Sequence, residues 1–293
     1  MKFLTYELNN TQGVGLQIDD VTYDLTKSSI VDSMQQLIEN YNIIKKVISN
    51  AVTNGALIEL EKDAQIKAPI PTPKRDIFCV GKNYLEHAKE FGKSGFDAGS
   101  TGGDEIPEFP IIFTKATTSV TGPNDPILSY LDPDNSVDYE GELAVIIQNG
   151  GRGIKKSEAH NHIFGYTVLN DVTARIAQKK HKQWVIGKGV DSFCPMGPVI
   201  ITADELTHVG DLELTTHVNE ELRQKTQVKD LIFDIPTLIE TISSVITLMP
   251  GDIIATGTPV GVGIGFNPPI YLKPGDKVRV SVSSIGSIEN PVI

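Results

Sequence analysis

From about residue 77 onward, short runs of β-branched and other apolar residues alternate with Gly, Pro and Asp. Runs this short, bounded by turn-forming residues, favour strands, because a helix needs a longer periodic stretch. The runs are DIFCVG, IIFTK, GELAVII, FGYTVLND, GPVIIT, LELTTHVN, DIIATG and KVRVSVSSI. Helices are expected at 155–162 and, more strongly, at 235–247, where apolar residues keep a helical period. The pattern predicts an α+β fold that is predominantly β.

The first 68 residues show a different pattern. Residues 2–25 contain strand-like runs around the turn sequence NNTQG, which predicts a β-hairpin. Between residues 30 and 58 the spacing is helical, with apolar residues at Met34, Leu37, Ile38, Ile43, Ile44, Val47 and Ile48. The segment KAPIPTPK follows, and its prolines exclude a helix there. We expect a small α+β domain over residues 1–68 and the main domain over 69–293.

Composition limits the partners of the chain. Its 26 Lys and Arg against 37 Asp and Glu give a formal charge of −11, the wrong sign for binding a nucleic acid backbone. Cys79 and Cys194 lie in apolar or Pro-flanked contexts, which indicates two buried, reduced thiols. The start of the chain lacks the apolar core of a signal peptide, and no apolar run approaches the roughly 18 to 20 residues that cross a bilayer. We therefore expect a cytoplasmic protein with no nucleic acid or membrane partner.

In the segment VDYEGELAVII, Glu140 and Glu142 lie two residues apart at the start of an apolar run. Residues i and i+2 of a strand share a face, so these carboxylates would repel each other unless a positive charge lay between them. A hard cation such as Mg²⁺ or Mn²⁺ meets that need, and Asp171, at the end of the run FGYTVLND, offers a third oxygen ligand. The alternative is a solvated pair on an exposed strand. Spacing alone leaves both interpretations open.

The segment CVGKNYLEHAKEFG places His87 and Glu90 three residues apart, which makes them neighbours on a helical turn. A carboxylate beside an imidazole orients it and raises its basicity, as in a general base that acts on water. The alternative is a solvated surface pair. The glycine-rich stretch between Phe91 and Phe109 directly follows, and we expect it to be a mobile loop that gates this base.

A third polar cluster follows Asp171, in the segment DVTARIAQKKHKQWVIGKGVDSFCPMGP. Glycines flank Lys188 on both sides, which indicates close backbone approach rather than open solvent. For Lys179, Lys180 and Lys182 we expect a solvated helical face.

The segment PGDIIATGTPVGVGIGF ends a strand in a glycine-rich turn. Its glycines permit backbone amides to approach a small anion, and Thr256 and Thr258 add hydroxyls. The alternative is a plain turn. It is not a phosphate-binding Walker loop, because GxxxxGK[ST] is absent, and it does not have the context of a dinucleotide fingerprint.

With these motifs in place, the chain resembles the fumarylacetoacetate hydrolase superfamily from about Ile77 to Pro291. The resemblance rests on CVGKNYLEHAKE, IIFTK, VDYEGELAVII, FGYTVLNDVTAR, the stretch from Lys188 to Pro198, and PGDIIATGTPVGVG. It implies a roll of mixed β-sheets with a small N-terminal α+β domain, and a homodimer. It also implies one divalent cation, Mg²⁺ or Mn²⁺, in each subunit.

The resemblance assigns roles to individual residues. Glu140, Glu142 and Asp171 match the metal ligands, and the catalytic positions match His87 and Glu90, the water-activating pair, and Lys188, near the metal-bound oxygen. The positions that match substrate-binding residues are Lys82, Tyr84, Lys115, Arg175, Gln178, Gly257 and Thr258.

Two departures from the family pattern weaken any transfer of substrate identity. Ile176 follows Arg175 where the family often has Asp. Lys82 stands where many acylpyruvate-cleaving members have Arg, which replaces a planar bidentate donor by a point charge.

The activity expected from this resemblance is cleavage of a C–C bond in a 2-oxo acid, by a hydrolase such as an acylpyruvate or fumarylpyruvate hydrolase or by an oxaloacetate decarboxylase. The alternative is an isomerase or decarboxylase of 2-hydroxyhepta-2,4-diene-1,7-dioate. All three reactions would use one site, so the motifs do not separate them. Two alternatives are not enzymes: a binding protein that has lost activity, and a scaffold with a solvated acidic strand.

Overall fold

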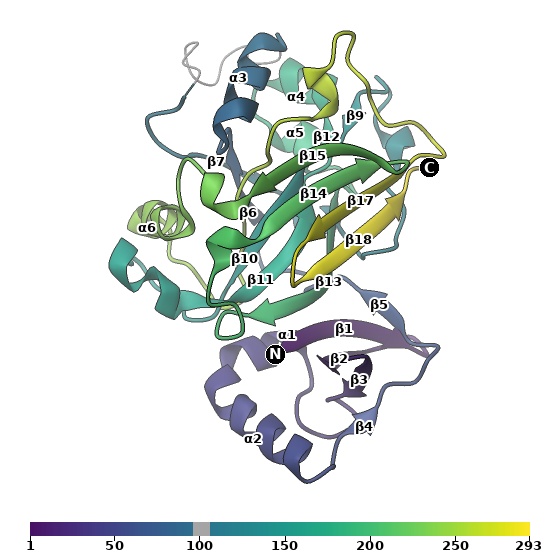
Figure 1. Cartoon of the computed structure of the whole chain (residues 1–293), viewed down its shortest axis with the longest axis vertical. Helices are drawn as coiled ribbons and strands as arrows, with labels where there is room; N and C mark the ends of the chain where they lie inside the picture. Colours follow the sequence, from purple (N-terminus) through teal and green to yellow (C-terminus); the bar gives the residue numbers. More distant parts are fainter. Residues whose placement is uncertain (96–105) are drawn as a thin grey trace.

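The computed structural model describes residues 1–95 and 106–293. Its largest feature is a mixed sheet with the strand order β4-β3-β2-β1-β13-β11-β10-β16-β6-β7, in which β5 pairs with β1 and β8 with β13 (Figure 1). The strands of this sheet are β1 (Lys2–Leu8), β2 (Thr11–Ile18), β3 (Val21–Asp24), β4 (Ile58–Glu59), β5 (Gln65–Lys67), β6 (Ile77–Gly81), β7 (Ile111–Lys115), β8 (Val120–Thr121), β10 (Gly141–Ile147), β11 (Ile163–Asn170), β13 (Cys194–Thr202) and β16 (Ile253–Ala255).

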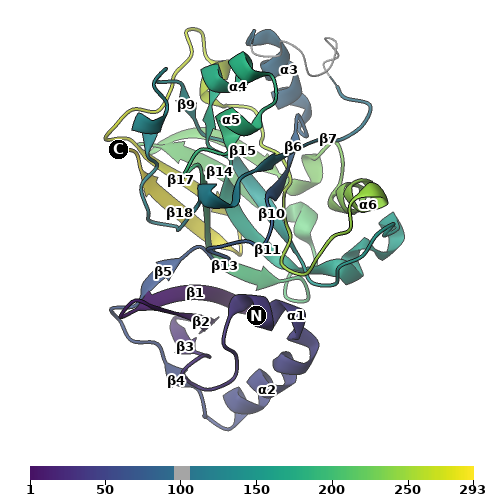
Figure 2. The same cartoon turned by 180° about the vertical axis from the view of Figure 1, so that it is seen from behind.

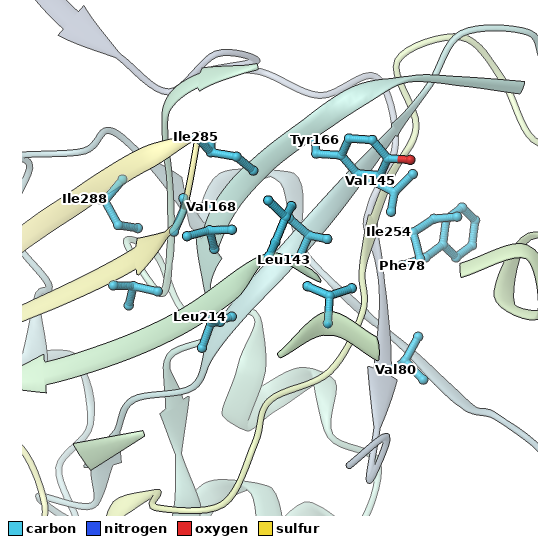
Figure 3. Close-up of a cluster of buried hydrophobic side chains, with 14 of the residues drawn as sticks. Phe78, Val80, Leu143, Val145, Tyr166, Val168, Leu214, Ile254, Ile285 and Ile288 are labelled. Atoms are coloured by element: carbon cyan, nitrogen blue, oxygen red, sulfur yellow. The ribbon is translucent and has the colours of Figure 1, made fainter. Parts of the chain in front are cut away.

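A second, antiparallel sheet packs on the centre of the first. Its order is β15-β14-β17-β18, with β14 (Glu213–Val218), β15 (Glu221–Gln227), β17 (Lys277–Val282) and β18 (Gly286–Pro291). Leu143, Val145 and Val168 of the main sheet lie in one apolar cluster with Leu214 and Ile288 of the second (Figure 3). Burial of apolar side chains between two sheets is the dominant stabilising contribution of such a sandwich.

The N-terminal lobe continues the main sheet instead of standing apart from it. Strand β1 pairs antiparallel with β13, with Phe3 opposite Ile200. Helices α1 (Met34–Glu39) and α2 (Tyr41–Thr53) pack on this part of the sheet through a second apolar cluster, where the rings of Phe3 and Phe164 stack at 6.2 Å. Figure 1 shows this lobe at the opposite end of the molecule from α3, α4 and α5.

The helices of the main part have local causes. Helix α6 (Ile235–Val245) begins after Asp234, whose side chain accepts a hydrogen bond from the amide of Thr237, and it buries Leu238, Ile239 and Ile242. Helices α3 (Leu85–Lys93), α4 (Arg175–His181) and α5 (Val185–Lys188) are shorter and lie together at one end of the main sheet (Figure 2).

The α+β fold with mostly sheet, expected from the sequence, is confirmed. The helical region predicted between residues 30 and 58 is two helices within 34–53, and Ile58 instead lies in β4. The helix predicted at 155–162 is a 3₁₀ segment, η3 (Lys156–His162), whose tighter turns suit a short connector. Both cysteines are buried free thiols, as predicted.

Two further expectations concern a membrane-spanning helix and the loop between Phe91 and Phe109. In the part of the chain that the structure describes, no helix has the length and apolarity needed to span a membrane. The loop predicted between Phe91 and Phe109 begins within α3, which ends at Lys93, and its residues 96–105 lie outside the described residues.

Candidate active site

Two strand ends bring the three acidic residues together. Strands β10 and β11 pair antiparallel with Gly141 opposite Asn170, so the residues that flank Gly141 lie beside the residue that follows β11. The amide of Asp171 donates to the carbonyl of Glu140 at 2.8 Å, and the amide of Glu140 donates to the side chain of Asn170 at 2.9 Å. Glu140, Glu142 and Asp171 are all buried, and their carboxylate oxygens lie within 4.8 Å of one another.

Three cationic side chains neutralise part of this cluster. Lys188 Nζ lies 2.7 Å from Glu140 Oε2 and 2.7 Å from Asp171 Oδ2, so it bridges the two carboxylates. Arg175 Nη1 lies 2.6 Å from Glu140 Oε1, and Lys115 Nζ lies 2.7 Å from Asp171 Oδ1. All three cations are buried, so their charges act through a medium of low dielectric constant.

Glu142 differs from its two neighbours, because within the described residues no Lys, Arg or His side chain forms an ion pair with it. Its Oε2 accepts a hydrogen bond from the amide of Gly257 at 2.8 Å. Burial raises the pKa of Glu142 well above its usual range, and the negative charges of Asp171 and Glu140 raise it further.

Glu140 titrates in the opposite direction. Burial alone would raise its pKa, but Lys188 and Arg175 outweigh burial and hold the pKa of Glu140 at about 2. A cluster of three buried oxygen donors, one of them without a cationic side chain beside it, fits a hard divalent cation.

Close packing of glycine delivers Lys188 to the cluster. A Cβ atom on Gly187 would lie 2.6 Å from the amide nitrogen of Gln178 and 2.8 Å from the carbonyl oxygen of Ala174. Helix α5 therefore packs directly on the backbone of α4, which confirms the close backbone approach expected around Lys188. Also as predicted, the face with Lys179, Lys180 and Lys182 is exposed.

His87 and Glu90 form a second polar group on α3. His87 Nδ1 lies 3.1 Å from Glu90 Oε2, and His87 is buried. Glu90 also accepts from the amide of Gly261, at 3.1 Å and 3.3 Å for its two oxygens. A Cβ atom on Gly265 would lie 1.9 Å from Glu90 Oε1, so this loop requires glycine where it passes the carboxylate.

A small cavity connects the acidic cluster with His87. Its polar lining consists of Lys82, His87, Glu140, Gln178, Lys188 and Thr258. Its apolar wall includes Phe91, Phe113 and Trp184, whose indole ring lies 6.0 Å from the Phe91 ring and 5.0 Å from the Phe113 ring. Lys82 Nζ lies 5.3 Å from the centre of the Phe91 ring. Lys82 and Lys188 both line this cavity.

Four of the residues that match substrate-binding positions do not line this cavity. Lys115 donates to the carbonyl of Val172 at 3.0 Å and to that of Lys188, which places it behind Asp171. Arg175 lies behind Glu140 with no exposed surface. Gly257 offers its amide to Glu142, and Tyr84 is the buried residue that precedes α3. Lys115, Arg175 and Gly257 thus contact the carboxylates of the cluster.

The glycine-rich segment after β16 does bring backbone amides to anions, but the anions belong to the protein. The amide of Gly257 donates to Glu142, that of Gly261 to Glu90, and those of Gly263 and Ile264 to Asp138. The sequence left open whether this segment binds a small anion or is a plain turn. In the structure each of these four amides has a carboxylate of the protein as its partner.

The sequence analysis missed two polar residues of the site. Gln224 of β15 accepts from the amide of Gly141 at 3.0 Å and donates to Thr258 Oγ1 at 2.8 Å, so it holds the peptide between the two glutamates. Asp138 forms an ion pair with Arg175 at 2.8 Å. Asp138 continues the alternation of Glu140 and Glu142 back along the chain, which was an available signal; nothing around Gln224 in the sequence indicates its contact.

The fold thus brings a buried carboxylate cluster and a histidine–glutamate pair to one cavity. The family model described as the C-terminal part of fumarylacetoacetate (FAA) hydrolase matches residues 76–293. The chain belongs to this family.

Relatives and solved structures agree over the whole length. The chain is 42% identical over 309 residues to the oxaloacetate tautomerase YisK of Bacillus subtilis, with 100% of both proteins covered. It matches the fumarylacetoacetate hydrolase of the psychrophile Exiguobacterium antarcticum with 37% identity and a TM-score of 0.83, covering 100% of this chain and 99% of that one. It matches the maleylpyruvate hydrolase of Sphingobium sp. SYK-6, solved with manganese(II) and pyruvate, with 30% identity, a TM-score of 0.81 and the same coverage.

Proposed function

We propose that this protein is a divalent-metal-dependent enzyme of 2-oxo acids, and that its reaction is the keto–enol tautomerisation of oxaloacetate. The observation that carries the proposal is the cavity that joins Glu140 and Lys188 to His87. Such a cavity places an acidic cluster that fits a cation beside a group able to transfer a proton. The 42% identity to an oxaloacetate tautomerase over the full length of both chains supports the choice of substrate.

Glu140, Glu142 and Asp171 would hold the cation, Mg²⁺ or Mn²⁺. When bound, such an ion supplies Lewis-acid stabilisation of negative charge on a 2-oxo acid. The ion pairs favour this assignment. Lys115, Arg175 and Lys188 pair with carboxylates at Asp138, Glu140 and Asp171, whereas Glu142 forms no ion pair within the described residues. A divalent ion would make the site positive, which suits an anionic substrate.

His87 would transfer the proton. Tautomerisation removes a proton from the carbon next to the 2-oxo group and places a proton on the oxygen, and the reverse reaction exchanges these steps. Glu90 holds His87 through Nδ1, which leaves Nε2 to take up and return the proton. Lys188 places an ammonium group at the cluster, where negative charge develops on the substrate oxygen.

Lys82 suits the second carboxylate of a dicarboxylic substrate. It lines the same cavity as Lys188, on the side of Phe91. A ligand with an acidic group at each end would meet one lysine at each end. Oxaloacetate has this chemistry, and a monocarboxylic 2-oxo acid would leave the second lysine without a ligand charge.

The proposal is tested by following the ultraviolet absorbance of enolic oxaloacetate as it converts to the keto form, with Mn²⁺ and after chelation. We expect a rapid conversion that depends on the metal. Glu90→Gln is compared with Glu86→Gln, a matched control on the same helix, because Glu86 is exposed and its ion-pair partner among the described residues is Lys89. If calorimetry shows that the protein binds Mn²⁺ and the protein still does not accelerate tautomerisation, the proposed reaction is ruled out.

C–C bond cleavage, the activity expected from the sequence, is the second candidate. The His87–Glu90 pair favours it, because the same imidazole could deprotonate water for attack on a distal carbonyl. The maleylpyruvate hydrolase relative, solved with manganese(II) and pyruvate, supports it as well. Release of pyruvate from acylpyruvates, fumarylpyruvate or oxaloacetate would report cleavage or decarboxylation, whereas tautomerisation releases none. 2-Hydroxyhepta-2,4-diene-1,7-dioate belongs in the same panel.

A further inference from the structure

Asp138 is buried where β9 (Val137–Asp138) leads to the acidic cluster, and both of its oxygens are fully engaged. Oδ1 accepts from the amides of Tyr139 at 2.9 Å and Gly263 at 2.7 Å. Oδ2 accepts from the amide of Ile264 at 3.1 Å and from Arg175 Nε at 2.8 Å. The Asp138 carboxylate thus joins Arg175, which pairs with Glu140, to the glycine-rich loop.

Arg175 connects Asp138 to the acidic cluster. Its Nε bonds Asp138 while its Nη1 lies 2.6 Å from Glu140 Oε1, so the planar guanidinium spans the two carboxylates. A planar fork held at one edge fixes the direction of its other donors. The position of the Glu140 carboxylate therefore depends on how Asp138 holds Arg175.

The glycine-rich loop connects Asp138 to the His87–Glu90 pair. Gly263 and Ile264 follow Gly261, whose amide donates to Glu90. Ile264 also belongs to a small apolar cluster with Phe91 and Val262, which anchors α3. The place of this loop therefore sets the place of Glu90, and Glu90 in turn orients His87.

We infer that Asp138 is a positioning residue that couples the two halves of the site, the acidic cluster and the His87–Glu90 pair, so that loss of the contacts its carboxylate makes displaces Glu140 and Glu90 together. The expected change in metal binding rests on the function proposed above, and the hold on the loop does not.

Asparagine at this position breaks the arrangement whichever way its amide group turns. Each oxygen of Asp138 accepts from two donors, so an NH₂ group in either place faces two N–H groups and removes two hydrogen bonds. The change keeps the volume of the side chain. Asp138→Asn therefore tests the charge and its acceptors rather than the packing.

The experiment measures amide hydrogen exchange by mass spectrometry in segments 85–93 and 257–266, and Mn²⁺ affinity by calorimetry. For Asp138→Asn we expect exchange in both segments to become at least about tenfold faster. We expect Mn²⁺ affinity to fall by roughly 10- to 100-fold, as is usual when a partner of a metal ligand is lost. Arg175→Lys, which leaves the loop amides their acceptor, should weaken Mn²⁺ binding and leave exchange in segment 257–266 unchanged.

Asp134→Asn is the matched control, because Asp134 is exposed on the same stretch of chain; it should change neither measurement. Slow exchange in β10 shows that the fold is intact. If Asp138→Asn does not fold, Asp138→Glu is measured instead. It keeps the charge but moves both oxygens by one methylene group relative to their four donors, so it should show the same pair of effects at smaller size.

An Asp138→Asn protein with wild-type exchange in segment 257–266, or one with altered exchange and wild-type Mn²⁺ affinity, overturns the coupling. Altered exchange in Arg175→Lys equal to that in Asp138→Asn overturns it too, because the loop would then depend on the guanidinium. Wild-type protein that binds no Mn²⁺ would instead contradict the proposed function, and segment 257–266 would still decide whether Asp138 holds the loop.

Discussion

The two halves of the site are built differently: the acidic cluster on the main sheet is called the sheet half, and the His87–Glu90 pair on α3 is called the helix half. Glu142 lies within β10, and Asp171 directly follows β11, at the centre of the main sheet, and cations and amides bond their oxygens from several elements. His87 and Glu90 instead lie on α3, a helix of nine residues. The apolar anchor of α3 is Phe91, in a small cluster separate from the two large ones.

The difference follows from the work each half does. Mutually repelling carboxylates stay together in a buried place only when the surrounding framework overdetermines their positions, which strands paired on both sides provide. A proton-transferring group must meet a substrate that enters after the site has formed, and a small helix with few anchors can adjust to it. We therefore expect changes in the sheet half to abolish binding and changes in the helix half to slow the reaction.

The largest effect is expected for Asp171→Asn, which breaks the sheet half. The amide removes a negative charge from the cluster and places an NH₂ group against either Lys188 or Lys115, depending on its orientation. Turnover should fall by roughly 1,000-fold or more, the equivalent of several kcal/mol of electrostatic stabilisation, and calorimetry should show loss of Mn²⁺ binding. Asp191→Asn, at an exposed position nearby, is the control. Turnover within tenfold of wild type would show that Asp171 is no ligand.

His87→Asn should separate the halves. Loss of a positioned general base costs typically 100- to 10,000-fold in rate, and the acidic cluster keeps all its own partners. Steady-state kinetics should therefore show a fall in kcat of roughly 100-fold or more, with Mn²⁺ affinity unchanged. His160→Asn, on the exposed 3₁₀ segment, is the matched control. A parallel loss of metal affinity would mean that α3 belongs to the sheet half, and the comparison would fail.

The third prediction concerns pH and the sheet half alone. Burial, then the charges of Asp171 and Glu140, raise the pKa of Glu142, so a proton occupies it at pH values where an ordinary glutamate is ionised. A cation must displace that proton, and below the raised pKa its affinity should fall by about tenfold per pH unit of acidification. Glu140, with a pKa of about 2, should contribute no proton in this range.

Calorimetry at about pH 5.5 in buffers with different ionisation enthalpies measures the protons released. We expect about one proton for each Mn²⁺ bound, in His87→Asn as in the wild type. Release that disappeared in His87→Asn would assign the proton to the helix half instead.

How well the sequence predicted each half depends on the range of the contacts involved. Alternation predicted Glu140 and Glu142 on one face, and the end of a strand offered Asp171 as a third ligand, but spacing alone left a solvated pair equally open. The family resemblance selected the three residues, and the structure brings them together. The spacing of His87 and Glu90 was equally local, and the structure shows the two side chains in contact.

Long-range contacts were not accessible in the same way. Gln224 reaches Gly141 from 83 positions further along the chain, and the amide of Gly261 reaches Glu90 across 171 positions. Such contacts follow from the order of strands in two sheets, which no local period encodes. The same reason explains Lys115 and Arg175, which were expected at the substrate but lie behind Asp171 and Glu140.

The smallest effect is expected for Phe91→Leu, which loosens the packing of α3 and changes no polar side chain. Phe91 packs with Val262, Ile264 and Trp184, and a smaller side chain there should cost about 1 kcal/mol of local stability. If α3 must dock for proton transfer, kcat should fall about fivefold, with Mn²⁺ affinity unchanged.

Trp184, the one tryptophan of the chain, reports docking directly, because its fluorescence should change when its contact with residue 91 is altered. Phe109→Leu, at a side chain that is 70% exposed, is the control. Altered fluorescence with unchanged kcat would show that the packing of α3 and the rate are independent. The helix half would then be as rigid during turnover as the sheet half. The two halves would differ in how they are built and not in how they move.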